Sequence, residues 1–226
     1  TEELVQKGFA AYQAENCDYI IAFGGGSPID TAKAIKILTA NPGPSTAYSG
    51  VGKVLNTGVH LVAINTTAGT AAEMTSNAVI IDSARQVKEV IIDSNIIPDI
   101  AVDDASVMLD IPASVTAATG MDALTHAVEA YVSVGAHPLT DANALEAIRL
   151  ITLWLPKAVD EGHNLEAREQ MAFGQYLAGM AFNSAGLGLV HALAHQPGAT
   201  HNLPHGVCNA ILLPVIENFN RPNAVP

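Results

Sequence analysis

The chain has 226 residues, of which 49% are hydrophobic and 14% are charged. This composition argues against a disordered chain, which carries more charge and fewer apolar residues, and the length allows one large domain or two smaller ones. The formal net charge of −12 argues against capture of nucleic acid or anionic lipid by a basic surface. An anionic cofactor must therefore be held by local dipoles.

Cysteine spacing and the N-terminal residues indicate the compartment. Cys17 and Cys208 lie far apart and form no CxxC spacing, so a disulfide framework has no support and a reducing cytoplasm is expected. No apolar run reaches the roughly 18 residues of a membrane span, and the first residues lack the profile of a signal peptide. We therefore expect a soluble protein that has neither membrane nor nucleic acid as a partner.

The first hundred residues have the pattern of an α/β domain. Apolar spacing indicates one helix over residues 2–14 and a second from a glycine-rich loop to about residue 38. Prolines and glycines predict a loop over residues 41–53. Short apolar or β-branched runs predict strands at residues 18–23, 60–65, 77–82, 87–93 and 100–102. The two runs at 77–82 and 87–93 suggest a hairpin.

After Asp104 the pattern becomes helical, and β-branched runs disappear. The predicted helices cover residues 114–133, 139–159, 164–182, 186–197 and 206–218. We therefore expect a domain boundary near residue 105, between an α/β domain and an all-helical one. Because residue 1 is a threonine and helical spacing begins at once, the chain is expected to start within a domain.

A glycine-rich turn follows the first predicted strand and carries the sequence GGGSP, from Gly24 to Pro28. Three glycines let backbone N–H groups approach an anion, and the next helix offers its positive N-terminal end. Ser27 is the expected N-cap, with Asp30 close to a capping box. GGGS is not GxGxxG and also fits a plain turn, but ligands of open α/β sheets bind at the carboxyl ends of strands, which favours phosphate binding.

Threonines and one lysine nearby are less informative. Thr66, Thr67 and Thr70 follow the strand over 60–65 and could line the same crevice, although threonine-rich turns also form without a ligand. Lys88 lies in the predicted hairpin, where a lone basic residue is usually a solvated edge charge. Spacing alone therefore leaves these residues unassigned.

Histidines and an aspartate have the spacing of a metal site. His191 and His195 are four residues apart on one predicted helix, and Asp122 and His126 have the same spacing on another, so each pair shares a helix face. His205 follows a proline and can fold back toward them. A mixed oxygen and nitrogen set suits Fe²⁺ or Zn²⁺, whereas Ca²⁺ and Mg²⁺ prefer oxygen. A single histidine is more often structural, but two such pairs favour ligation.

The sequence resembles the iron-containing (group III) alcohol dehydrogenases. The similar stretches follow the family's order and cover nearly the whole chain: GGGSPIDTAKAI, INTTAGTAAEMT, TAATGMDALTHAVEAYVS, REQMAFGQYLAGMAFNSAGLGLVHALAHQPG and LPHGVCNAILLP. Hydrolase signatures such as GxSxG and HExxH are absent. The sequence departs from the family's pattern at Pro197 and near His201. The resemblance therefore does not determine which residues form the wall of the substrate pocket.

The resemblance implies a role for individual residues. It places the metal ligands at Asp122, His126, His191 and His205, with His195 beside the metal as a catalytic proton relay. It places cofactor-binding residues at Gly25, Gly26, Ser27, Asp30, Thr66, Thr67, Thr70, Thr75 and Lys88, the first three on the pyrophosphate. The implied cofactors are NAD or NADP and Fe²⁺ or Zn²⁺.

The resemblance also implies the fold and the activity. The fold is an α/β Rossmann-like N-terminal domain followed by an all-α C-terminal domain, as in dehydroquinate synthase and iron alcohol dehydrogenases. This chain would carry a partial dinucleotide-binding domain over 1–105 and a partial helical metal-binding domain over 106–226. The activity is hydride transfer between the nicotinamide and a short-chain alcohol or aldehyde, usually in a homodimer.

Two alternatives remain: a non-redox lyase similar to dehydroquinate synthase, and a metal-binding fragment with impaired catalysis. Family members extend beyond both ends of this chain. An acidic residue roughly 20 positions after the first glycine-rich turn usually contacts the adenine ribose, yet no carboxylate lies between Asp30 and Glu73. We therefore expect incomplete cofactor recognition and slow turnover by these residues alone.

Overall fold

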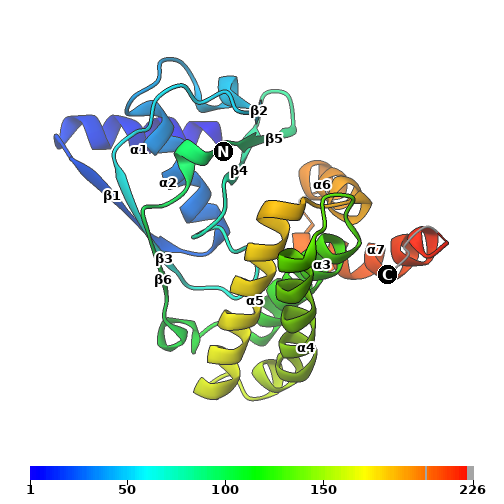
Figure 1. The fold of residues 1–226 in the computed structure, drawn as a ribbon. Coiled ribbons are helices and arrows are strands. Elements are labelled where there is room, and N and C mark those ends of the chain that lie inside the picture. The colour runs from blue at the N-terminus through cyan, green and yellow to red at the C-terminus, as the bar shows by residue number, and fades with distance from the viewer. Residues whose placement is uncertain (202, 223–226) are drawn as a thin grey trace. The chain divides into compact units, whose positions relative to one another are not determined.

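The computed structural model describes residues 1–201 and 203–222, with the backbone alone at residue 199. The chain forms two compact units (Figure 1). The first comprises Thr1–Thr66 and Ala72–Asp103, and the second comprises Thr67–Ala71 and the chain after Asp103. The predicted domains, 1–105 and 106–226, remain a prediction, because compactness does not show that either part folds alone.

A parallel sheet forms one part of the first unit. Its strands are β1 (Tyr19–Gly24), β3 (His60–Asn65) and β6 (Ile100–Asp103), in the order β1-β3-β6. Gly24 lies opposite Asn65, and Asn65 lies opposite Asp103, so the carboxyl ends of the three strands are level. Helix α2 (Gly26–Leu38) begins directly after β1 and packs Ile29 and Ala32 against apolar residues of β1 and β3. The predicted β-loop-α unit is confirmed.

A second sheet in this unit contains the predicted hairpin. Strands β4 (Asn77–Asp82) and β5 (Val87–Ile92) are antiparallel, and β2 (Gly50–Val51) pairs with β5. Strand β2 lies inside the predicted loop over 41–53, where two residues are too few to show a period in the sequence. Helix α1 (Glu2–Ala14) and the 3₁₀ helices η1 (Ser45–Tyr48) and η2 (Ser94–Ile96) complete the unit.

The second unit is helical, as the sequence predicts. It contains the 3₁₀ helix η3 (Ala105–Met108) and the helices α3 (Ala113–Val132), α4 (Pro138–Asp160), α5 (Leu165–Ala185), α6 (Leu189–His201) and α7 (His205–Asn220). Helix α5 ends later than predicted, where Gly186 adopts a φ of 82° that favours glycine. Helix α6 therefore begins at Leu189 and not at residue 186, and it continues past Pro197.

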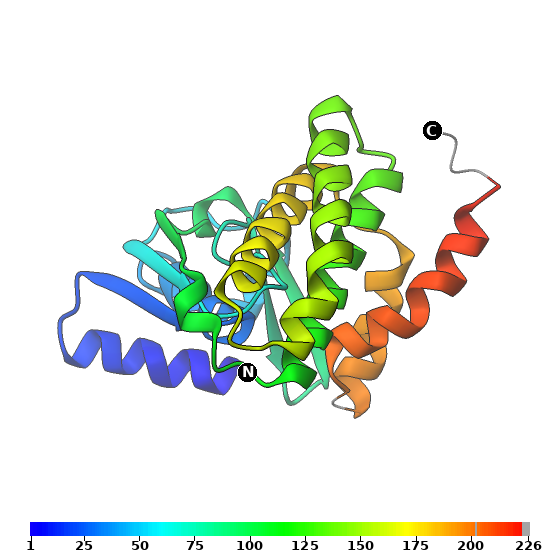
Figure 2. The same ribbon diagram turned by 90° about the horizontal axis from the view of Figure 1, so that it is seen from below.

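Small side chains let α3, α4 and α5 pack closely, and the three helices run side by side in both views (Figure 1, Figure 2). Ala123 and Ala127 of α3, Ala147 of α4 and Ala178 of α5 are fully buried in their shared core. Alanine adds little side-chain entropy cost and allows close helix approach. This packing fixes α3, which carries two of the predicted metal ligands.

Across residues 1–201 and 203–222, no single helix is both long and apolar enough to cross a membrane, and α5 with the first part of α6 passes that test only as a pair bent by 106°.

The start of α7 lies against the backbone of α3. A Cβ atom added at Gly206 would lie 1.8 Å from the carbonyl oxygen of Ala118, which is far inside van der Waals contact. Only glycine permits this approach without a backbone shift. Gly206 directly follows His205, so the contact sets how near His205 comes to α3.

We predict that Gly206→Ala lowers the free energy of unfolding by about 1–3 kcal/mol, the usual cost of overpacking. Gly162→Ala is the matched control, because a Cβ at Gly162 would have only an ordinary 3.5 Å contact with Arg168. Denaturant unfolding of both variants measures the difference. Equal stability of the two variants would contradict the close approach of α7 to α3.

Candidate metal centre

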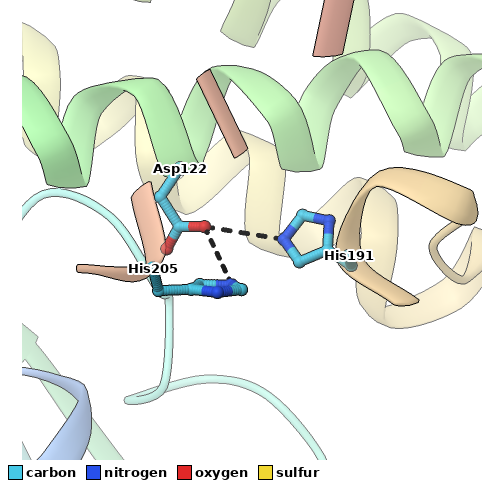
Figure 3. Close-up of side chains that lie close together, drawn as sticks. All are labelled: Asp122, His191 and His205. Carbon is cyan, nitrogen blue, oxygen red and sulfur yellow. Dashed lines mark ion pairs between the residues drawn. The ribbon is translucent and has the colours of Figure 1, made fainter. Parts of the chain in front are cut away.

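Three helices bring one carboxylate and three imidazoles together. Asp122 and His126 lie on α3, His191 on α6 and His205 on α7. The Oδ1 atom of Asp122 lies 3.5 Å from Nε2 of His191, 3.5 Å from Nε2 of His205 and 3.9 Å from Nε2 of His126. Figure 3 shows His191 and His205 directed at the Asp122 carboxylate. The structure thus brings together the four residues expected to hold a metal.

The side-chain amide of Asn209 lies among these atoms, and it has fewer protons than there are hydrogen-bond acceptors around it. The Nδ2 atom of Asn209 lies 2.7 Å from Asp122 Oδ1 and 3.3 Å from Nε2 of both His191 and His205. When both imidazoles are neutral with a lone pair on Nε2, one amide nitrogen, which carries two protons, cannot donate to all three acceptors at once. Among the described residues, its buried Oδ1 atom has no hydrogen-bond partner. A single cation at this position would serve all the acceptors, so the donor set fits a divalent ion.

The pKa values of the clustered side chains also favour binding of a divalent ion. Burial would raise the pKa of Asp122, but the neighbouring His126, His191 and His205 hold it well below its usual range, so the carboxylate is ionised. Burial lowers the pKa of His126 to about 3, which keeps the imidazole neutral and its lone pair available for an ion. Although burial opposes it, Asp122 and Glu129 raise the pKa of His191 to about 9. Positive charge at Nε2 of His191 is therefore favoured, and a bound divalent ion would take the place of a proton there.

Packing holds the His126 ring in place. It stacks on Phe182, with ring centroids 4.3 Å apart, and on His191, with centroids 4.4 Å apart. Both contacts are close parallel stacks, slightly shorter than the range of about 4.5–7 Å usual for aromatic pairs. The ring is therefore positioned by the core of the helical unit and does not depend on an ion for its orientation.

His195 lies beside the cluster, one helical turn after His191. Its ring centroid is 5.1 Å from that of His205 and 6.4 Å from that of His191. Its side chain is half-buried, unlike the fully buried His191. The remaining histidine of this stretch, His201, is exposed, and its Nδ1 atom lies 2.7 Å from the Thr200 hydroxyl.

Sequence reasoning missed two polar residues of this site. Glu129 has its Oε2 atom 2.5 Å from Nδ1 of His191, and Asn209 donates to Asp122. Glu129 lies seven residues after Asp122 on α3, and Asn209 lies four residues after His205 on α7. Both spacings place a residue on the same helix face as a ligand, and this signal could have identified them.

The glycine-rich loop lies between β1 and α2. Gly25 is the N-cap of α2, and no side chain within the described residues caps it. The expectation that Ser27 is the N-cap is wrong, because the chain enters the helix at Gly26 and Ser27 is already its second residue. The backbone N–H of Thr66 donates to the carbonyl of Gly24, which ties the end of β3 to this loop. Gly25, Gly26, Ser27 and Thr66 are therefore close to one another.

Asp30 and Thr75 belong to a polar network around the buried side chain of Lys33. The Nζ atom of Lys33 lies 2.8 Å from the carbonyl of Thr75 and 3.3 Å from its hydroxyl, and the Asp30 carboxylate accepts from the N–H of Val79. Asp30 therefore holds β4 and does not complete a capping box. Burial raises the pKa of Asp30 to about 6 and lowers that of Lys33 to about 8. Their expected cofactor roles remain predictions.

The other expected cofactor residues lie in different units. Thr67 and Thr70 belong to the segment Thr67–Ala71 of the second unit, where Gly69 lies against Thr119 of α3. Lys88 lies on β5 of the first unit, opposite Ile81 of the hairpin. Their contacts with a cofactor stay predictions.

Comparison with known proteins gives consistent matches over both units. Residues 1–105 match the family described as "Iron-containing alcohol dehydrogenase", and residues 116–225 match "Fe-containing alcohol dehydrogenase family, C-terminal". The chain is 52% identical over 216 residues to an NAD-dependent methanol dehydrogenase of Bacillus methanolicus, which covers 96% of this chain and 57% of that protein.

Solved structures share the fold. The crystal structure of a 1,3-propanediol oxidoreductase matches with a TM-score of 0.93 and 50% identity, over 96% of this chain and 56% of that one. Sulfoacetaldehyde reductase from Bifidobacterium kashiwanohense, in complex with NAD⁺, matches with a TM-score of 0.90 and 32% identity, over 96% and 58%. The chain thus spans a little more than half the length of the relatives it matches. By these family matches, identities and folds, it belongs to the iron-containing alcohol dehydrogenase family.

Proposed function

We propose that this chain carries the metal-binding and pyrophosphate-binding part of an oxidoreductase. The reaction is hydride transfer between NAD or NADP and a short-chain alcohol or aldehyde. The observation that carries this proposal is the convergence of three imidazoles on the buried Asp122 carboxylate. Relatives named as NAD-dependent methanol dehydrogenase and 1,3-propanediol dehydrogenase support the substrate class.

Asp122, His126, His191 and His205 are the proposed ligands of Fe²⁺ or Zn²⁺. The ligand atoms of Asp122, His191 and His205 lie within 4.8 Å of one another, and His126 stacks on His191 beside them. When bound, such an ion supplies Lewis acidity, which favours loss of the hydroxyl proton of an alcohol and polarises the carbonyl of an aldehyde. Counted over the four ligands alone, one carboxylate and three neutral imidazoles leave the bound ion with a net positive charge, which preserves that acidity.

His195 is the proposed proton relay. The reaction removes one proton from the alcohol hydroxyl, and a group next to the metal site must carry that proton to solvent. His195 is half-buried and lies next to His205, so it adjoins the site and also reaches toward water. In the reductive direction, the same imidazole nitrogen returns a proton to the oxygen of the product alcohol.

The N-terminus of α2 is the proposed pyrophosphate site. Its first N–H groups and helix dipole attract anions, and Gly25 and Gly26 carry no Cβ to obstruct the approach. The threonines at 66, 67, 70 and 75, together with Asp30 and Lys88, are proposed around the rest of the cofactor. The NAD⁺ complex of a relative with 32% identity and the same fold supports a nicotinamide cofactor.

We also propose a homodimer in a reducing cytoplasm. The family resemblance supports the dimer. Cys17 and Cys208 are both free thiols in the described structure, and Cys17 is exposed, which suits a reducing compartment.

The proposed activity is tested by following NADH absorbance with propanal and Fe²⁺. A protein of the relatives' length that contains residues 1–226 is expected to consume NADH only when metal is present. The 226-residue chain alone is expected to bind NAD⁺ weakly and to turn over slowly. Failure of both metal-loaded proteins to consume NADH would contradict the oxidoreductase, and tight cofactor binding without net consumption would favour the non-redox alternative.

The ligand assignment predicts that Asp122→Ala and His191→Ala each lose most of their bound Fe²⁺ or Zn²⁺, because an undersaturated ion is held weakly. The metal-dependent rise in thermal midpoint should fall as well, since a bound ion stabilises the native state by mass action. Elemental analysis and thermal unfolding measure both effects, with exposed His163→Ala as the control. Stoichiometric metal in both ligand variants would overturn the assignment.

His195→Ala is expected to separate chemistry from metal binding. The variant should keep its metal, and in a protein of the relatives' length its kcat should fall about 100-fold or more, the usual range for a lost acid–base group. Gln196→Ala, at the adjacent exposed position of α6, is the control. A loss of metal as large as in His191→Ala would instead make His195 a ligand.

A further inference from the structure

A buried carboxylate of α3, that of Glu129, contacts two residues in the first turn of α6. Glu129 is 1% exposed. Its Oε1 atom accepts from the N–H of Val190 at 2.7 Å, and its Oε2 atom lies 3.4 Å from the N–H of His191 and 2.5 Å from Nδ1 of the same residue. Among the described residues, no lysine or arginine pairs with this carboxylate. The N–H groups of α6 and the imidazole therefore satisfy its charge.

The contact determines which nitrogen of His191 is available. An ionised carboxylate only accepts hydrogen bonds, so the Nδ1 atom next to it carries a proton. In a neutral ring, Nε2 then keeps its lone pair. Nε2 is the atom that lies 3.5 Å from Asp122 Oδ1 in the candidate metal centre. Glu129 thus selects the tautomer that presents a lone pair to an ion.

The same contact also fixes the rotation of α6. Each residue of an α-helix turns by about 100°, so a slip of one position would direct His191 away from Asp122. The backbone contacts of Glu129 with Val190 and His191 oppose such a slip. A Cβ at Gly188 would lie 2.9 Å from Oε1 of Glu129, so glycine permits this close approach at the beginning of the helix.

The charges of the two carboxylates beside His191 also favour a bound divalent ion. The two buried carboxylates, Asp122 and Glu129, flank His191 on opposite ring nitrogens. A divalent ion would neutralise their combined charge, and a buried cluster without net charge costs less than one with unpaired charge. A carboxylate on the outer nitrogen also makes the imidazole a stronger donor to an ion.

We propose that Glu129 is a positioning residue of the metal centre, which orients His191, fixes its Nδ1–H tautomer and strengthens its Nε2 as a ligand. This inference rests on the proposed function, because it requires that His191 hold the ion. Glu129 itself does not touch the ion or the substrate. Its effect is therefore on metal affinity and on the state of the His191 ring.

Glu129→Gln separates this role from that of a helix cap. The amide oxygen can still accept from Val190, but the amide N–H₂ opposite Nδ1 favours a proton on Nε2, which blocks ligation. We expect Zn²⁺ affinity, measured by competition with a chelator, to fall by about 10- to 100-fold, the usual effect of losing such a partner. Glu146→Gln is the matched control, because it removes an exposed carboxylate of α4 that pairs with Arg149. Affinity within twofold of the unaltered chain would overturn the inference.

A second measurement needs no variant and holds even if Glu129→Gln fails to fold. Nitrogen-15 NMR of the His191 ring in the Zn²⁺-loaded 226-residue chain should show a protonated Nδ1 and a metal-bound Nε2. Ligation through Nδ1, or a proton on Nε2, would overturn the positioning role while the metal site stands. If the unaltered chain binds no Zn²⁺, the proposed metal centre fails and this inference fails with it.

Discussion

The helical unit is organised around one buried carboxylate, Asp122, which is costly to place away from water unless positive charge or hydrogen-bond donors surround it. The amide of Asn209 donates to it, and Nε2 atoms of three imidazoles lie within 3.9 Å of it, where a bound cation would complete the charge balance. Alanines of the core fix α3, while Gly206 lets α7 approach α3 until His205 reaches the carboxylate. The packing of α3 and the close approach of α7 therefore determine which partners surround this carboxylate.

Around Asp122, the described side chains offer more hydrogen-bond acceptors than donors. A bound cation would satisfy these acceptors. A polar cluster that holds no ion would be expected to satisfy its own hydrogen bonds, as the buried Lys33 ammonium does through the carbonyls of Thr75 and Asn77. Around Asp122, when the imidazoles are neutral, the amide of Asn209 faces three acceptors, and its own oxygen has no hydrogen-bond partner within the described residues. Membership of the iron-containing alcohol dehydrogenase family agrees with a divalent ion at this position.

Local sequence patterns predict much of this fold because they record which helix or strand face is buried. The spacing of Asp122 and His126 predicts their shared face, and the two β-branched runs predict the hairpin of β4 and β5. Strand β2 has two residues and therefore no period, and α2 starts at Gly26 with Gly25 as its N-cap, although serine has the stronger capping preference. The contact between Glu129 and His191 joins residues 62 positions apart, so tertiary packing alone determines it.

The central claim is that a divalent ion binds at the point where Asp122, His126, His191 and His205 converge. X-ray absorption spectroscopy of the Zn²⁺-loaded or Fe²⁺-loaded chain tests it most directly, because the spectrum reports the atoms bound to the ion. We expect scattering from three imidazole rings and at least one oxygen ligand, with no sulfur. A spectrum with a sulfur ligand, or one with water oxygens and no imidazole, would contradict the account.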